Sequence, residues 1–498
     1  MNTMFPRGTR CWLAFSLAVM LVACGQSSPD GGAPAAAKKV PITTSSERAR
    51  ELYLEGRALF DDLLFVDARD RFLQAVAADD GFAMGYFMAA QSAQTNAEFF
   101  DAVDKARERA GKASDGEQLY IKALVAAAGN DDAAQRAALE ELVALYPGDE
   151  RTHFQLANFL IGQQDFAGAA AHFTHATQIA PDFAGAYNSL GYAQRSLEDF
   201  AAARTAFEKY VDLIPDEANP YDSLAELLME MGEYDASIEN YRKALRINPD
   251  FPSSYAGISI NYSLKGEPEL AQEAADDMLA AARNFGERQG ALIQSAAAHL
   301  FAGETDAAMQ ACEVAMAEAV VAANHSAMGN VAEYMGDIML ASGEAAKAEA
   351  YYDAALDHRL AANLHEANNA QAARAHLFKT AIAAMVGGDS EAAASRTAEY
   401  IAAAEAHGIA FEKLRIHELS GYLAMNQEDN EAAAMHFAKS SQLQPIPLYW
   451  AARVNKDLGR MDKARELAER AANRNTLSLN LPFFRADALA LLAELSGA

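Results

Sequence analysis

The sequence is poor in cysteine, proline and positive charge. Its 498 residues include only three cysteines, Cys11, Cys24 and Cys312, so no framework of disulfides holds the fold together. With 14 prolines and 30 glycines, the chain is neither collagen-like nor of low complexity. Lysine and arginine total 41 against 69 acidic residues, and the formal net charge of −28 argues against a broad surface for nucleic acid.

Motifs that carry catalysis or bind metals are also missing. The chain has no Gly-x-Ser-x-Gly, no Walker-type loop and no glycine-rich dinucleotide fingerprint. His172 and His175 are three residues apart, and His358 and His365 are seven apart, but neither pair has a third ligand at helical spacing. This favours ordinary surface histidines over a metal pair. We therefore predict a protein that is not an enzyme and that has no cofactor and no metal.

Acidic pairs are common in the sequence, at Asp79-Asp80, Asp131-Asp132 and Asp276-Asp277. Helix N-termini and solvated faces both favour negative charge, so capping and solvation explain such pairs. We do not interpret them as the paired carboxylates of a hydrolase.

The first 23 residues are typical of a secretion signal. Arg7 and Arg10 precede about 13 mostly apolar residues, a run shorter than the roughly 20 that a membrane-spanning helix needs. The run ends Leu21-Val22-Ala23-Cys24, which resembles the lipobox of bacterial lipoproteins. That resemblance implies cleavage before Cys24 and lipidation of its thiol. The alternative is ordinary cleavage that leaves Cys24 as a spare thiol.

Lipidation would attach the mature chain to a membrane, because two or more acyl chains anchor a protein stably. Gly25, not an aspartate, follows the cysteine, and resemblance to other lipoproteins then implies the periplasmic face of the outer membrane. Residues 24–46 are rich in Gly, Ser, Pro, Ala and Lys, which predicts a flexible tether. Cys312 is then the remaining thiol, and we expect it to be inert in an alanine-rich helix.

Evenly spaced prolines organise the middle of the chain. Pro147, Pro181, Pro215 and Pro249 recur with a period of about 34 residues, and each marks the point where a helix has stopped. Aligned on these prolines, equivalent positions hold a leucine, then a small residue, then a second small residue, then an aromatic ring. These are Leu156, Leu190 and Leu224; Ala157, Gly191 and Ala225; Ala169, Ala203 and Ser237; Phe173, Phe207 and Tyr241.

This pattern resembles the tetratricopeptide repeat. The resemblance implies an all-α fold, a right-handed superhelical solenoid of stacked antiparallel helix pairs. One pair cannot bury its own apolar face, so at least three copies must stack. We expect about eleven or twelve repeats, with small residues where two helices approach closely.

The repeats extend from about Ala49, and their phase slips at Asn284-Phe285-Gly286, which leaves both a rigid joint and a hinge open. The expected organisation is a signal peptide, the tether, an N-terminal array, a degenerate C-terminal array and a capping helix. Their ranges are 1–23, 24–46, 47–284, 285–478 and 479–498.

The same resemblance implies where a ligand binds, because in this family the first helix of each repeat lines the inner surface. Asparagine can donate and accept hydrogen bonds along a peptide backbone, and tyrosine gives contact area at a low cost in entropy. Each candidate could equally belong to the polar face of a solvated helix. The partner-binding candidates are Asn158, Asn188, Tyr192, Arg195, Asp222, Glu226, Tyr53, Arg57, Phe87 and Gln91.

The sequence thus predicts a non-enzymatic scaffold or adaptor that binds a partner protein through its concave groove. The partner is expected to be another envelope protein, bound through a peptide segment or a helix, beside an envelope assembly or secretion machine. The acidic excess favours a neutral to basic partner. Phe154 stands where relatives that clamp a C-terminal carboxylate have lysine, so we predict no chaperone-tail binding. The alternative is a carbohydrate-binding accessory protein for polysaccharide or peptidoglycan processing.

Overall fold

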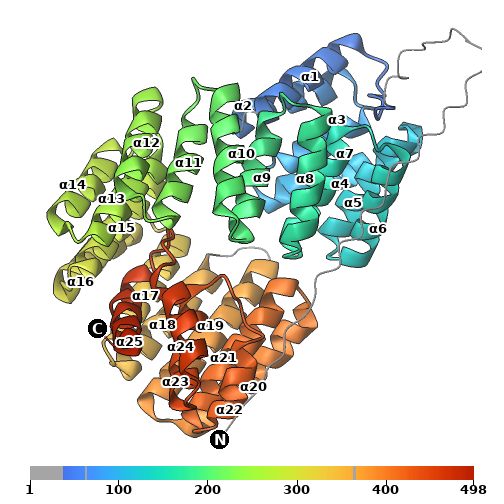
Figure 1. Cartoon of the computed structure of the whole chain (residues 1–498). Helices are drawn as coiled ribbons and strands as arrows, with labels where there is room; N and C mark the ends of the chain where they lie inside the picture. Colours follow the sequence, from blue (N-terminus) through green and yellow to red (C-terminus); the bar gives the residue numbers. More distant parts are fainter. Residues whose placement is uncertain (1–37, 62–63, 363–365, 498) are drawn as a thin grey trace, which may run out of the picture. The chain divides into compact units, whose positions relative to one another are not determined.

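The computed structural model describes residues 38–497 except 62–63 and 363–365. Within these residues it contains 25 α-helices and no strand, which confirms the all-α prediction. Consecutive helices α1 to α24 form twelve antiparallel pairs that stack in chain order, as in a solenoid, and α25 packs on α24 at the end (Figure 1). The signal peptide, Cys24 and residues 24–37 of the predicted tether lie outside the described residues.

Each pair has a first helix and a second helix, and the two sets are as follows. The first helices are α1 (Glu47–Asp61), α3 (Ala83–Gln91), α5 (Asp115–Ala128), α7 (Glu150–Gly162), α9 (Ala184–Ser196), α11 (Ala218–Glu230), α13 (Pro252–Lys265), α15 (Phe285–Phe301), α17 (His325–Ala341), α19 (Glu366–Gly387), α21 (Ala410–Asn426) and α23 (Pro445–Asp457). The second helices are α2 (Phe65–Ala78), α4 (Asn96–Arg109), α6 (Asp132–Leu145), α8 (Phe166–Ile179), α10 (Phe200–Leu213), α12 (Tyr234–Ile247), α14 (Pro268–Ala281), α16 (Thr305–Val321), α18 (Ala345–Ala361), α20 (Ser390–His407), α22 (Asn430–Phe437) and α24 (Met461–Ala472). The last helix is α25 (Arg485–Ser496), preceded by a 3-10 turn at Leu481–Phe483.

In several pairs an aspartate in the turn caps the second helix. Asp165 accepts a hydrogen bond from the Gly168 backbone N–H at 3.0 Å, and Asp199 accepts one from Ala202 at 3.1 Å. Such a cap satisfies a backbone N–H that has no partner within the helix. Asp131 does the same for α6, as predicted for the Asp131-Asp132 pair.

Small residues face aromatic rings where the two helices of a pair cross. A Cβ added to Gly191 on α9 would lie 2.6 Å from the Phe207 ring on α10, and one added to Gly421 would lie 2.8 Å from the Phe437 ring. Phe207 is fully buried. The repeated small residue therefore exists because a side chain at that position would collide with the aromatic ring of its own repeat.

The predicted break at residues 284–286 is a lengthening of the repeat. Helices α7, α9, α11 and α13 begin at evenly spaced residues, one proline period apart, whereas α15, α17 and α19 begin further apart, at Phe285, His325 and Glu366. Helices α15 to α18 are each 17 residues long, whereas α7 has 13 residues and α8 has 14. About one extra turn in each helix lengthens the repeat to roughly 40 residues. Asn284 caps α15 by accepting a hydrogen bond from the Glu287 backbone N–H at 2.9 Å.

Two further features bear on the predictions. Cys312 lies buried on α16, and burial raises the pKa of its thiol to about 12, which keeps the thiol protonated and unreactive. None of the helices in the described part of the chain is both long and apolar enough to cross a membrane.

Candidate functional site

Residues 38–46, the N-terminal segment, lie extended against the body of the first four repeats. Exposure alternates along the segment: Val40, Ile42 and Thr44 are half-buried, whereas Pro41 and Thr43 are exposed. This alternation is that of an extended strand with one face against the protein. The C-terminal end of the predicted tether is therefore bound to the repeats.

Three carboxylates from different repeats hold the segment. The Val40 N–H donates to Asp149 Oδ2 at 2.8 Å, and the Thr43 N–H donates to Glu117 Oε1 at 2.8 Å. The Thr44 hydroxyl donates to Asp79 Oδ2 at 2.6 Å. Asp149 and Glu117 lie at the N-terminal ends of α7 and α5, and Asp79 follows α2. Hydrogen bonds from backbone N–H groups to carboxylates are stronger than neutral ones and do not depend on the donor's side chain.

Asp79 therefore does more than the predicted solvation of a helix end. The hydrogen bond from Thr44, with those from Ser45 and Gly81, lowers the pKa of its carboxyl, although partial burial opposes this. The carboxylate is thus held in its charged form, as an acceptor for the segment.

Lysines at the start of the segment add charge contacts. Lys39 forms an ion pair with Glu150 at the start of α7, and the Lys38 ammonium lies 4.4 Å from the centre of the Tyr146 ring. Burial works against the charge of Glu150, but the hydrogen bond and charge of Lys39, a backbone hydrogen bond and the charge of Arg151 together outweigh it and lower the pKa of that carboxyl.

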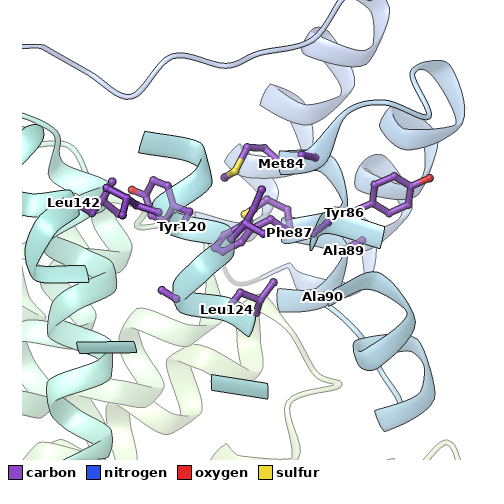
Figure 2. Packing of buried hydrophobic residues seen from close by; sticks show 14 of the residues in the cluster. Met84, Tyr86, Phe87, Ala89, Ala90, Tyr120, Leu124 and Leu142 are labelled. Atoms are coloured by element: carbon purple, nitrogen blue, oxygen red, sulfur yellow. The ribbon is translucent and has the colours of Figure 1, made fainter. Parts of the chain in front are cut away.

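A small pocket of about 70 Å³ lies beneath the segment. Three of the predicted residues, Tyr53, Arg57 and Phe87, line it from α1 and α3, together with Tyr120 of α5 and Arg151 of α7. The Phe87 and Tyr120 ring centres are 5.5 Å apart, and Figure 2 shows these two rings side by side. The pocket joins four consecutive repeats, because α1, α3, α5 and α7 are the first helices of those repeats.

The pocket also holds two arginines whose hydrogen-bonding capacity is not used up. Arg151 forms an ion pair with Asp61, with Nη1 and Oδ1 3.0 Å apart, but its Nε is buried without a hydrogen-bond partner in the described residues. Arg57 Nε is likewise buried without a hydrogen-bond partner among the described residues. Burial raises the pKa of Tyr53, although the charge of Arg57 opposes this rise. Gln91 and Asn158, also predicted, are exposed and do not line the pocket.

Four other predicted residues lie on α9 and α11; Tyr192, Arg195 and Glu226 bind one another, and Asp222 binds serines of α13. The Tyr192 hydroxyl donates to Glu226 Oε2 at 3.0 Å, and Arg195 Nη1 lies 2.6 Å from Glu226 Oε1. Asp222 accepts a hydrogen bond from the Ser254 hydroxyl at 2.7 Å. Burial raises the pKa of Asp222 to about 6.

Asn188 lies half-buried on α9, and its Oδ1 is buried without a hydrogen-bond partner in the described part of the chain. It shares a helix with Tyr192 and Arg195, but among the described residues its side chain makes no hydrogen bond or ion pair with that cluster.

The segment between α24 and α25 completes this second cluster, and the sequence reasoning missed it. Arg474 Nε lies 3.2 Å from Glu230 Oε1, and Asn475 Nδ2 donates to the Met229 carbonyl at 3.1 Å. Arg195 Nε lies 3.5 Å from the same Glu230 carboxylate. Four of the predicted residues on α9 and α11 are therefore paired within the chain, namely Tyr192, Arg195, Asp222 and Glu226.

The histidines form pairs that were not predicted. His172 Nδ1 lies 2.9 Å from His153 Nδ1, and the exposed His175 ring stacks on His153 with centres 5.3 Å apart. Burial lowers the pKa of both His153 and His172. His172 is thus a half-buried partner of His153 and not an ordinary surface residue. In the described residues no group of three or more possible metal-ligating side chains is suited to hold a metal ion. His365 lies outside the described residues.

Comparison with known families agrees with the helix pairs. A model described as a tetratricopeptide repeat matches residues 184–217, which contain α9 and α10, and one described as a TPR repeat matches residues 225–258. No curated protein matches the chain.

Solved structures similar to the chain include three repeat proteins. MamA is 23% identical with a TM-score of 0.30, over 34% of this chain and 94% of its own. A tetratricopeptide repeat protein from Parabacteroides merdae ATCC 43184 is 13% identical with a TM-score of 0.40, over 54% of this chain and 98% of its own. PilW, described as a widely conserved type IV pilus biogenesis factor, is 17% identical with a TM-score of 0.35, over 41% of this chain and 92% of its own.

Proposed function

Because this chain is a tetratricopeptide repeat protein, we propose that it is a non-enzymatic adaptor that binds an extended segment of a partner protein. The binding face is the one that the first four repeats present to residues 38–46. One observation carries the proposal: this face already holds an extended peptide by its backbone N–H groups. Stacked repeats offer such continuous surfaces, and backbone contacts give affinity to an extended ligand.

The charge of the face indicates the charge of its partner. Glu117, Asp149, Asp79 and Glu150 all point carboxylates at the N-terminal segment, and the whole chain has a net charge of −28. A basic partner segment would be steered to this face, and its association would weaken as salt is added.

Lipid attachment through Cys24, on the periplasmic face of the outer membrane, completes the proposal. It is supported by the lipobox-like run Leu21-Val22-Ala23-Cys24 and by Gly25. On this basis the partner is another envelope protein. Metabolic labelling with an alkyne palmitate should mark the chain and should be lost in Cys24→Ser, which should also leave the outer-membrane fraction. Equal labelling of the two proteins would contradict the anchor.

Crosslinking in intact cells tests the adaptor role. A photo-reactive amino acid placed at Gln155, which lines the pocket, should give a discrete adduct with an envelope protein identified by mass spectrometry. The matched control is the same amino acid at the exposed Lys209 on α10, the second helix of the next repeat, which does not line the pocket. An adduct of equal yield from Lys209, or no adduct from Gln155 with another protein, would contradict binding on this face.

The carbohydrate alternative gains little support from the rings on this face. Tyr53, Phe87 and Tyr120 are 4%, 3% and 6% exposed with the N-terminal segment in place. Sugar rings stack on open aromatic faces, and these three rings pack on other side chains.

A further inference from the structure

The N-terminal segment occupies the face that the proposed partner needs. We propose that residues 38–46 are a built-in competitor, and that the partner segment which displaces them has the same chemistry. That chemistry is an extended strand in which a basic residue directly precedes a β-branched apolar residue, with a second β-branched residue two positions later. The inference rests on the proposed function, since it names the partner class and the regulation of the same site.

The register of the segment defines that chemistry. Lys39 pairs with Glu150, and the next residue, Val40, turns its side chain to the protein while its N–H binds Asp149. Ile42 faces the protein again after the exposed Pro41. Val40 and Ile42 both pack against the apolar cluster of the first repeats.

The repeat surface is shaped for a close approach at this point. Gly116 lies in the first turn of α5, and a Cβ added there would lie 2.9 Å from Val40 Cγ1 and 2.7 Å from the Tyr146 ring. A larger residue at position 116 would push the segment away. The space above α5 therefore fits a β-branched side chain in an extended peptide.

The segment is built to be replaced without unfolding a repeat. It contributes no helix, and Lys38, Lys39, Pro41, Thr43 and Ser45 remain exposed. Its main-chain bonds go to carboxylates, which accept any peptide N–H equally well. Another strand of the same register can take these bonds one for one.

Two arginine N–H donors beneath the segment lack an acceptor, which a better ligand would supply. Arg57 and Arg151 line the pocket beneath it, and the Nε of each is buried without a hydrogen-bond partner in the described residues. A partner whose inward side chain carries an oxygen acceptor would satisfy one of them. Buried donors without partners are costly, so such a partner gains over the chain's own Ile42.

Peptide binding in trans tests the competition. The probe is a dye-labelled synthetic peptide of residues 38–46, and the protein is the full chain in detergent. Lys39→Glu with Thr43→Pro removes the ion pair and one N–H donor of the built-in segment and should release it. Fluorescence anisotropy should then show peptide binding at least about tenfold tighter than to the unsubstituted chain, because a tethered competitor acts at an effective concentration near millimolar. The charge control is Arg48→Glu, an exposed position, which should leave binding unchanged.

A charge swap identifies the site of binding. For the charge swap the released chain carries Lys39→Ala with Thr43→Pro, so that its own segment cannot pair with a lysine at position 150. In that chain Glu150→Lys should abolish binding of the peptide, and a peptide carrying Lys39→Glu should recover it. A peptide N-methylated at Val40 and Thr43 should bind weakly, because it lacks the two donors. Circular dichroism should show the same helix content in the released and the unsubstituted chain, which separates loss of competition from loss of folding. Lys39→Glu alone is a milder release and should give a smaller gain in peptide affinity.

Four results would overturn the inference. The first is equal affinity of the peptide for the released and the unsubstituted chain, and the second is no peptide binding by a released chain that is folded. The third is that the charge swap leaves peptide binding unchanged. The fourth is a concentration-dependent dimer that the releasing substitutions abolish, because a second copy of the chain would then be the occupant. If the Gln155 crosslink to an envelope protein persists while peptide binding fails, the competitor is refuted and the proposed function stands. If both fail, the proposed function falls with it.

Discussion

Gly191→Ala should destabilise the α9–α10 pair although alanine is the better helix former. The added Cβ would lie 2.6, 2.7 and 2.8 Å from three carbon atoms of the Phe207 ring. Phe207 is 0% exposed, so the ring cannot move toward solvent. Overpacking of this kind costs about 1–3 kcal/mol, while replacing a glycine inside a helix returns about 0.5–1 kcal/mol. We expect a net loss of about 1–2 kcal/mol in the local free energy of unfolding.

Gly290→Ala is the matched control, because it makes the same change inside α15 without a collision. Its added Cβ would meet only Met278 Cε, at 3.8 Å, an ordinary contact. This variant should gain about 0.5–1 kcal/mol. The helix-propensity contribution is common to both variants, so the difference between them, about 1–3 kcal/mol, isolates the overpacking.

Hydrogen exchange followed by mass spectrometry is the suitable measurement, since a solenoid need not unfold in one step. Amides of α9 and α10 should exchange about tenfold faster in Gly191→Ala, and those of α19 and α20 should not change. If the two variants shift exchange in the same direction, or if distant repeats respond as strongly as α9 and α10, the account of the small-residue positions is wrong.

Three further predictions concern buried charge. Burial raises the pKa of Asp222 to about 6, so the stability of the fold should fall as pH rises from about 4 to about 6. Asp222→Asn should flatten this fall and add on the order of 1–3 kcal/mol to the free energy of unfolding at pH 7, measured by urea titration. Because the pKa values of His153 and His172 are lowered in the folded protein, the unfolded chain takes up protons first as pH drops below about 6.5. Stability should therefore fall from about pH 6.5 down to the folded pKa values, and His153→Gln with His172→Gln should weaken that loss, measured by hydrogen exchange in α7 and α8. Arg474→Ala should leave the Glu230 carboxylate with less compensation, cost about 1–3 kcal/mol and speed proteolysis between α24 and α25.

Several features of this protein follow from local rules and could be predicted from the sequence. Pro147 and Pro181 mark helix ends because proline lacks an N–H, and Gly191 and Phe207 recur because each repeat must bury the same crossing. Such rules act within about 34 residues, the length of one repeat. Tyr53, Arg57 and Phe87 were placed on the first-helix side by the same register, and they do line one pocket.

The lengthened repeats were harder to predict. An alanine-rich helix such as α16 or α18 gains a turn without a new proline or glycine signal, so the sequence pattern loses phase while the pairing continues. The interruption at Asn284 is a cap, and a cap looks the same in sequence whether a helix begins a new domain or the next repeat.

By itself the sequence determined the helix pairs, their stacking and the side of each helix that is buried, because these depend on neighbours one repeat away. The state of the N-terminal segment was decided only by the tertiary structure. Its composition resembles a tether, and the Val40, Ile42 and Thr44 alternation is a short signal. The carboxylates that bind it are 109, 74 and 35 residues away in the chain. The same holds for the ion pair of Arg474 with Glu230, because most of the C-terminal repeats lie between these two residues in the sequence. A contact over such separations depends on how all the intervening repeats stack, and no local pattern encodes it.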